Sequence, residues 1–380
     1  MQRSRVAVLK TSPATVLDDY KRLMRLAGYS EFLPRDRETA LKINISWHFF
    51  YPACSTTPWQ LDGVIATLLE DGYAKERLYG CHNRTVVVSA KRGEVVNKHK
   101  QVVVDKYGLR NIHLYEKSEP WVRYEPKAKM LVLDSIYPDG IRIPKRLIGS
   151  NIIHLPTLKT HVFTRITGAM KNAFGGLLNE KRHWTHSVIH ETLADLLMIQ
   201  KEIHSGLFAV MDGTVAGSGP GPRCMDIHIK NLILASADQV AIDAVAAKIM
   251  GFDPLGLAFI RAAHERGLGV GDPKEIEIVG EDIAEINWGF NSGDTFASRG
   301  QHAIYHGLFK PLENLLLRTP LVVWAYMASW AYHDWYWYPF VGRARVARFM
   351  ETPWGKMFER YGERGDLPLG TAEPSPAHSS

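Results

Sequence analysis

Cations, an imidazole and an amide gather in one part of the chain, LPTLKTH followed by TGAMKNAFGG. The side chains of interest are Lys159, His161, Lys171 and Asn172. Imidazole titrates near neutral pH, which makes His161 the candidate general acid or base. Lys171 is the candidate for a covalent or charge-stabilising catalytic role. We assign Lys159 and Asn172 to ligand binding; the alternative interpretation is a surface loop with solvated lysines.

Two more polar side chains interrupt an apolar segment, LKINIS. Lys42 and Asn44 fall on the same face of the strand expected there, because side chains alternate between the two faces of a strand. Such a pair indicates that this face ends in a polar pocket. Thr56 and Thr57, which open the next helix, join them as candidate ligand-binding residues, since exposed helix N–H groups favour an anion. The alternative is an edge strand protected by charge.

Three histidines lie close together in RHWTHSVIH. If a helix begins near His183, then His183, His186 and His190 share one face at spacings of three and four residues. Imidazoles in that arrangement could bind a transition metal, so His161, His186 and His190 are the candidate metal ligands. His186 is also a candidate catalytic residue. The alternative is a group of exposed histidines at a helix end.

A glycine-rich loop, MDGTVAGSGPGPR, leaves another expected strand. It follows neither the phosphate-loop pattern nor the dinucleotide-binding pattern, so it does not support nucleotide binding. Asp212 at the strand end and Arg223 at the loop end are candidate ligand contacts. The alternative is a tight turn that needs glycine for its backbone conformation.

The elements that would position these residues alternate between short β-branched runs and helical patterns. This alternation predicts an α/β fold with a mainly parallel, doubly wound sheet and helices on both faces. The expected strands are Arg5–Leu9, Ala40–Ile45, Val86–Ser89, Asn111–Tyr115, Met130–Asp134, Asn151–Leu155, Leu207–Asp212, Asn231–Ala235 and Glu275–Val279.

Two helix starts are clear in the sequence. TPWQ can form a capping box from Thr57, and SADQ can form another from Ser236. Gly72 and Gly251 are the corresponding helix ends. Because each helix follows a strand, we expect both N-termini at the carboxyl edge of the sheet, where open α/β folds bind ligands.

Composition narrows the class of protein. Apolar residues make up 46% and charged residues 23% of the 380 residues, which is typical of a globular protein. The net charge of +6 comes from scattered lysines and arginines, so no nucleic-acid partner is expected.

Cys54, Cys81 and Cys224 lie far apart, which argues against a disulfide framework and against a local set of metal or iron–sulphur ligands. The N-terminus has too short an apolar run for a secretory signal, which predicts a cytoplasmic protein.

The C-terminal part has a different character. We expect an α/β domain over residues 1–300, an aromatic helical extension over 301–364 and a flexible tail over 365–380.

The uncharged run Thr319–His333 has 15 residues, fewer than the about 20 needed to cross a bilayer. Residues 320–348 could pack on their own domain, form a homodimer, or lie peripherally on a membrane with their arginines facing anionic lipid. We favour packing or dimerisation over membrane contact.

The elements Lys42-x-Asn44, PTLKTH…TGAMKNAFGGL, Asp212 with its glycine loop, and SADQVAIDAVAAKIMGFDP together resemble domain-of-unknown-function family 362. The resemblance spans about residues 40–255, implies the α/β fold and names no reaction. Many members carry a ferredoxin-type cysteine cluster. This chain lacks that cluster, so we expect no iron–sulphur cofactor.

A shorter stretch resembles the lactate racemase family: His161 followed by Lys171 within TGAMK, ahead of a glycine pair. In that family the lysine tethers a nickel-pincer nucleotide, and histidines ligate nickel or move a proton. The resemblance implies that Lys171 is a tether and His161 a ligand or acid/base. It also implies that His186 or His190 is a second acid/base.

Together these patterns favour an enzyme that acts on a small metabolite bearing a carboxylate or phosphate, with racemase- or epimerase-like chemistry. The rival hypothesis is a non-catalytic ligand-binding or assembly protein that docks through its aromatic segment. An electron-transfer protein is disfavoured, because isolated cysteines cannot supply a four-thiolate cluster.

Overall fold

The computed structural model describes residues 4–85, 87–305, 307, 310–312, 319 and 322–361. A large sheet lies at its centre, with neighbouring strands in the order β12-β1-β11-β10-β7-β2-β3-β4. The strands are β1 Arg5–Lys10, β2 Thr39–Ile43, β3 Leu78–His82, β4 Arg110–His113, β5 Trp121–Tyr124, β6 Ile141–Pro144, β7 Asn151–Leu155, β8 Thr157–His161, β9 Arg165–Ile166, β10 Gly206–Ser218, β11 Asp226–Ser236 and β12 Glu277–Gly280. The α-helices are α1 Val16–Leu26, α2 Pro58–Glu70, α3 Ala90–Val96, α4 Leu133–Ile136, α5 Gly168–Leu177, α6 Ile189–Ile203, α7 Gln239–Met250, α8 Ala258–Glu265, α9 Phe296–Tyr305, α11 Val323–Trp330, α12 Arg343–Met350 and α13 Pro353–Arg360.

The sheet is mainly parallel, as the alternation of strands and helices predicts. Only β11 on the main path runs antiparallel to its neighbours β1 and β10. Strand β10 is long enough to pair first with β7 and then with β8, both in parallel. The end of β8 therefore extends beyond the carboxyl ends of β7 and β2, and it carries His161 with it.

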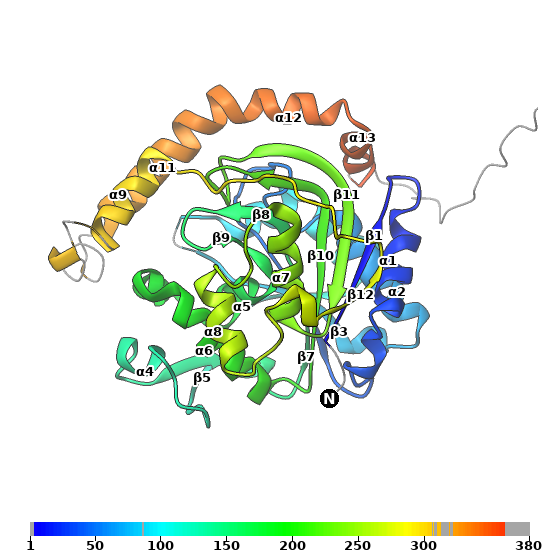
Figure 1. Ribbon diagram of the computed structural model, residues 1–380, viewed down its shortest axis with the longest axis horizontal. Coiled ribbons are helices and arrows are strands. Elements are labelled where there is room, and N and C mark those ends of the chain that lie inside the picture. The colour runs from blue at the N-terminus through cyan, green and yellow to red at the C-terminus, as the bar shows by residue number, and fades with distance from the viewer. Residues whose placement is uncertain are drawn as a thin grey trace, which may run out of the picture.

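Apolar side chains on both faces of the sheet build two cores. On one face, strand residues such as Ala40 and Ile152 pack with α5, α6, α7 and α8. On the other face, their neighbours Leu41 and Ile153 pack with α1, α2 and the C-terminal α13. This alternation follows from the two-residue period of a strand. The α/β fold with helices on both faces is confirmed (Figure 1).

The C-terminal residues form a long helical arm. Helix α11, a π-helical segment Ala331–Gly342 and α12 follow one another and arch over the sheet edge (Figure 1). We call residues 323–350 the aromatic arm. No helix among the described residues is both long and apolar enough to cross a membrane. The predicted tail over 365–380 lies outside the described residues.

Two expected strands are wrong. Residues 130–134 lead into helix α4, because the Asp195 carboxylate accepts the N–H groups of Leu131, Val132 and Leu133 and fixes a helix start there. Of the expected strand Val86–Ser89, residues 87–89 are described, and they lead into α3, whose N-cap is Ser89. In both places the hydrogen bonds of a capping side chain favour a helix start over the strand that the short β-branched run predicts.

The expected helix with three histidines on one face is also wrong. His183 and His186 lie in a 3₁₀ segment, Glu180–Val188, and α6 begins only at Ile189. His190 therefore belongs to a different element from the other two. Its ring stacks on Phe259 of α8, with ring centroids 6.2 Å apart.

One of the two helix starts lies where we expected it. Thr57 forms the capping box with Gln60 at the start of α2. Helix α7 instead starts at the amino edge of the parallel strands, because it follows the antiparallel β11, whose Ser236 pairs with Ala209 near the start of β10. Its N-cap is Asp238, which accepts two backbone N–H groups, and not Ser236.

Candidate functional site

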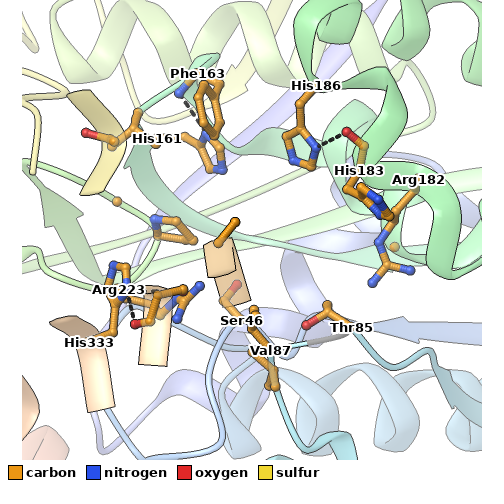
Figure 2. A pocket seen from close by; sticks show the side chains of 18 of the residues that line it. Ser46, Thr85, Val87, His161, Phe163, Arg182, His183, His186, Arg223 and His333 are labelled. Carbon is orange, nitrogen blue, oxygen red and sulfur yellow. Dashed lines mark hydrogen bonds between the residues drawn. The ribbon is translucent and has the colours of Figure 1, made fainter. Parts of the chain in front are cut away.

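A pocket of about 740 Å³ lies between the carboxyl ends of β2 and β8 and the aromatic arm. Figure 2 shows side chains from both sides pointing into the same space, with His161 and His186 opposite Arg223 and His333. The polar and charged lining residues are Lys42, Asn44, Ser46, Asn83, Thr85, His161, Thr167, Lys171, Asn172, Arg182, His183, His186, Arg223, Thr295, Ser298, Ser329 and His333.

The charged side chains that line this pocket are all basic. Lys42, Lys171, Arg182 and Arg223 face it, and none of the described lining residues is an aspartate or glutamate. The charge of Asp334 acts to raise the pKa of Arg223, but Asp334 is bonded to Trp47 and His48 and does not line the pocket. An enclosed cation without a carboxylate is costly, so the arrangement favours a negatively charged ligand.

Burial changes the protonation of the pocket amines. Burial, together with the nearby charges of Lys159 and Arg182, lowers the pKa of Lys171 to about 7. Burial also lowers the pKa of Lys42 to about 8. A substantial fraction of Lys171 is therefore a neutral amine at neutral pH, and a bound anion would restore its charge.

Gly176 of α5 makes room for the Lys42 side chain. A Cβ on Gly176 would lie 2.8 Å from Lys42 Cε, so this lysine crosses the helix where the side chain is missing. The ammonium donates to the carbonyl of Ile43, 2.7 Å away. Asn172 of the same helix donates from Nδ2 to the carbonyl of Lys42. Gly176 and Asn172 thus position this cation.

The backbone fixes which nitrogen of each pocket histidine carries the proton. The N–H of Phe163 donates to His161 Nδ1 at 3.1 Å, so neutral His161 carries its proton on Nε2. His186 Nδ1 donates to the carbonyl of His183 at 3.0 Å, so its Nε2 carries a lone pair (Figure 2). His161 consequently offers the pocket an imidazole donor, and His186 offers it an imidazole acceptor.

Both imidazoles are held in the neutral form. Burial lowers the pKa of His161 well below its ordinary value, and the charge of Lys171 adds to the effect. The same causes lower the pKa of His186 to about 3. Neutral imidazole is the form that can accept a proton from a substrate at neutral pH.

Several buried polar atoms in the pocket wall have no hydrogen-bond partner among the described residues. They are Asn44 Nδ2, Thr85 Oγ1, Thr167 Oγ1 and Arg223 Nη1. A buried donor left without an acceptor costs about 1–3 kcal/mol. A ligand with several acceptor oxygens would satisfy these groups.

Seven of the predicted site residues lie together in the pocket wall. They are Lys42, Asn44, His161, Lys171, Asn172, His186 and Arg223.

Lys159 and Thr56 lie behind the pocket wall. The Lys159 ammonium donates to the carbonyl of Cys54 at 2.6 Å and to Thr157 Oγ1 at 3.1 Å. Thr56 donates to the carbonyl of Leu155 and accepts the N–H of Asn44. Both residues therefore hold the strand ends in place instead of facing a ligand.

Asp212 and Thr57 form a separate buried network. Asp212 accepts hydrogen bonds from Tyr20, Thr57, Trp59 and Thr214, which satisfy its two oxygens. Burial raises the pKa of Asp212, and these donors act in the opposite direction. The network fastens helices α1 and α2 to the middle of β10, so we assign these two residues a structural role. The predicted position of Asp212 at a strand end is wrong, because β10 continues through the first glycines of the expected loop to Ser218.

Some pocket residues were missed by sequence reasoning. Arg182 directly precedes His183 in the histidine-rich stretch, so its place in the sequence could have indicated it. Its guanidinium donates to the carbonyl of Arg84. His333 and the aromatic residues Trp324, Tyr326 and Tyr332 enter from the arm. Nothing in their local sequence indicates which part of the sheet they cover.

The arm is fastened to the α/β domain by side chains far apart in the sequence. Trp47 Nε1 donates to Asp334 Oδ1 at 2.7 Å, and the Tyr338 hydroxyl donates to the carbonyl of Phe50 at 3.0 Å. Trp330 Nε1 donates to the carbonyl of Val87. These bonds place the inner face of the arm over the pocket.

Comparisons with known proteins give a family and one relative. Residues 39–248, more than half of the chain, match the model of a family described as "Domain of unknown function (DUF362)". The Thylakoid-associated protein sll1697 of Synechocystis sp. is 27% identical to this chain over 139 residues. That alignment covers 36% of this chain and 43% of the relative's length. No solved structure matches the chain. The matched residues 39–248 include β2, β8 and α5 with their pocket side chains, whereas the aromatic arm lies outside them.

Proposed function

The chain belongs to the DUF362 family, and we propose that its pocket binds a small anion and that the protein acts on this ligand as an enzyme. The observation that carries the proposal is the lining: its charged members among the described residues are all cations. The anion is a carboxylate or phosphate, because both offer the acceptor oxygens that lysine, arginine and the unpartnered pocket donors require.

The pocket also favours a ligand with an apolar or aromatic body. Its volume of about 740 Å³ exceeds what a bare phosphate or acetate would fill. On the arm side the wall consists of Trp324, Tyr326, Tyr332 and Tyr336, opposite the cations of the sheet edge. A ligand with an anionic head and a ring or short chain matches both walls.

The two imidazoles suggest proton transfer. His186 Nε2 would remove a proton from the carbon next to the ligand's carboxylate or carbonyl group, and His161 Nε2–H would donate a hydrogen bond to the oxygen that gains charge. The Lys171 ammonium would return a proton to the carbon, which leaves an isomer of the substrate. Exchange with water then restores the protonation of His186 and Lys171.

Lys171 also meets the chemical requirement for the tether that the resemblance to lactate racemases implies. Its pKa of about 7 leaves free amine at neutral pH, which is the reactive form. The role of a nickel-pincer cofactor remains a prediction. Intact mass and elemental analysis of protein purified without chelators would show an added mass on Lys171 together with nickel.

Thermal melting with two matched probes tests the anion site. We expect 1-naphthalenesulfonate to raise the melting temperature of the full chain, and the uncharged 1-naphthalenemethanol to leave it nearly unchanged. Ligand at a hundred times its Kd stabilises a protein by about 2.7 kcal/mol. Equal stabilisation by both probes would show that the pocket recognises only the apolar ring.

A second candidate function rests on the outer face of the aromatic arm. Val323, Met327, Trp335 and Phe340 are exposed there, with Phe340 75% exposed. Arg343 and Arg348 follow at the exposed start and end of α12. Apolar and aromatic side chains with adjacent arginines suit the surface of an anionic membrane. The relative carries the name thylakoid-associated, which agrees with such contact.

Vesicle flotation distinguishes membrane contact of this arm from contact between two copies of the chain. We expect the full chain to float with vesicles of phosphatidylcholine and phosphatidylglycerol, and the double variant Trp335→Ser/Phe340→Ser to stay in solution. Arg343→Gln/Arg348→Gln should weaken binding to anionic vesicles alone. If the wild-type chain sediments as a dimer and does not float, the exposed face is a contact between two copies.

A further inference from the structure

A group of metal-ligand side chains lies outside the pocket, at the ends of β3 and β4. His82 and His113 are register partners on these adjacent parallel strands, and each is the last residue of its strand. Register partners point to the same face of a sheet. Helix α3 contributes Glu94, which is 6% exposed, from above that face. None of the three lines the pocket.

The ligand atoms converge on one point. His82 Nε2 lies 2.8 Å and His113 Nε2 lies 2.9 Å from the same carboxylate oxygen, Glu94 Oε2. All three atoms lie within 4.8 Å of one another. Metal bonds of about 2.0–2.2 Å to such atoms place tetrahedral ligands roughly 3.3 Å apart. The carboxylate oxygen needs to move only about half an ångström from each imidazole nitrogen to admit an ion of that size.

Outer contacts orient the imidazole of His113, whereas His82 Nδ1 has no hydrogen-bond partner among the described residues. His113 Nδ1 is 3.0 Å from Glu116 Oε1, and Lys91 holds the same oxygen at 3.2 Å. A carboxylate on the second nitrogen is the usual partner of a metal-bound histidine, because it fixes the ring and raises its basicity. The ring of Tyr115 stacks on His113 at an interplanar angle of 9°.

The cluster is held together at Glu94 Oε2. His82 and His113 both bond to this oxygen through Nε2, so a bound ion would take the place of these two protons. Asn111 donates to Glu94 Oε2 at 2.7 Å, and its own Oδ1 has no partner among the described residues.

From this geometry we propose that His82, Glu94 and His113 bind a divalent transition-metal ion of the zinc class. Two imidazoles and one carboxylate are ligands that zinc and its neighbours accept, and three protein ligands leave a fourth position for water. The ion would tie β3, β4 and α3 together. Because the unfolded chain lacks this arrangement, the ion also stabilises the folded state.

Calorimetric titration of the chelator-treated full chain with Zn²⁺ tests the proposal. We expect one equivalent to bind tightly and to raise the melting temperature. Glu94→Gln keeps the size of the side chain but removes its charge, and it should weaken this binding at least a hundredfold. Glu116→Gln should weaken it by about 10–100-fold, as loss of an outer partner does. Co²⁺ in place of Zn²⁺ should give visible absorption that Glu94→Gln abolishes.

The pocket histidines provide the matched control. His186→Asn should retain tight Zn²⁺ binding, and Glu94→Gln should retain its response to 1-naphthalenesulfonate, so that the two sites are tested separately. Circular dichroism identifies any variant that fails to fold. If Glu94→Gln fails to fold, the Co²⁺ spectrum of Glu116→Gln decides whether these residues hold the ion. The proposal is overturned if Zn²⁺ does not bind the wild-type chain tightly. It is equally overturned if His186→Asn loses the ion while Glu94→Gln keeps it.

Discussion

Lys171 illustrates how strongly a single residue of this pocket depends on its surroundings. Its ammonium lies over the ring of Phe174, with Nζ 5.4 Å from the ring centroid, and no carboxylate faces it among the described lining residues. Burial, followed by repulsion from Lys159 and Arg182, therefore lowers its pKa. A bound anion raises the pKa of Lys171 again, so ligand binding and proton uptake are linked at this residue.

Anion affinity should consequently fall as the pH rises. The ligand-free pKa values are about 7 for Lys171 and about 8 for Lys42. Well below pH 7 both amines already carry charge, and the affinity for 1-naphthalenesulfonate should be constant. Above pH 7 Lys171 must take up a proton on binding, and above pH 8 Lys42 must do so as well, which costs up to about tenfold in affinity per pH unit and per amine. Calorimetry in two buffers of different ionisation enthalpy would measure the uptake; pH-independent binding between pH 6 and 9 would contradict it.

The tautomers of the two pocket imidazoles can be observed directly. We expect ¹⁵N nuclear magnetic resonance to find the proton on Nε2 in His161 and on Nδ1 in His186, because of their bonds to Phe163 N–H and to the His183 carbonyl. Both rings should remain neutral at pH 5, since burial lowers their pKa values. The same tautomer in both rings would remove the donor–acceptor pair on which the proposed proton transfer depends.

At the scale of elements, the start of helix α5 positions much of the pocket. Gly168 has φ of +71°, and the following N–H groups of Ala169 and Met170 donate to the Asp243 carboxylate of α7. A Cβ on Gly168 would lie 2.4 Å from that carboxylate. Glycine is required here for both its backbone conformation and its size.

Two glycine substitutions in this helix should therefore have opposite effects. Gly168→Ala should lower the free energy of unfolding by about 2 kcal/mol or more, through a strained φ and a clash. Gly175→Ala, whose Cβ would come no closer than 3.9 Å to Lys42 Nζ, should be neutral or should stabilise by up to about 1 kcal/mol. Urea denaturation of both variants compares them. Equal losses would show that the helix start tolerates a side chain.

Elements with strong local signals could be predicted from the sequence. Strand β7 agrees with its expected bounds, and the Thr57 capping box is confirmed. The error before α3 is local, because Ser89 caps that helix through Arg92 N–H. Two other errors depend on partners distant along the chain. Asp195 turns residues 130–134 into a helix start, and the antiparallel direction of β11 moves the N-terminus of α7 to the other edge.

The same limit applies to the candidate site. Strand alternation and chain order indicated Lys42, Asn44 and His161, which do line the pocket. They could not distinguish these side chains from Lys159, whose ammonium turns inward to the carbonyl of Cys54. Spacing reveals which residue types lie near a sheet edge, but hydrogen-bond partners decide which of them face the ligand.

At the scale of the whole molecule, the aromatic arm closes the pocket. It comes from the far end of the chain, and the bond from Trp47 to Asp334 joins residues 287 positions apart. Its inner side chains, such as Tyr332 and His333, complete the wall that the sheet edge begins, while Trp335 and Phe340 remain on the outside. The predicted packing on its own domain therefore accounts for one face of the arm, and the outer face stays available to lipid or to a second copy.

The central claim is that an anion binds among the pocket cations, and a titration of variants with 1-naphthalenesulfonate tests it most directly. Lys171→Met and Arg223→Met should each weaken the wild-type affinity at pH 7 by at least about tenfold, because a hydrogen bond to a charged group contributes about 1.5–3 kcal/mol. Lys274→Met, an exposed lysine outside the pocket, should bind like the wild type. Unchanged affinity in both pocket variants would contradict the account.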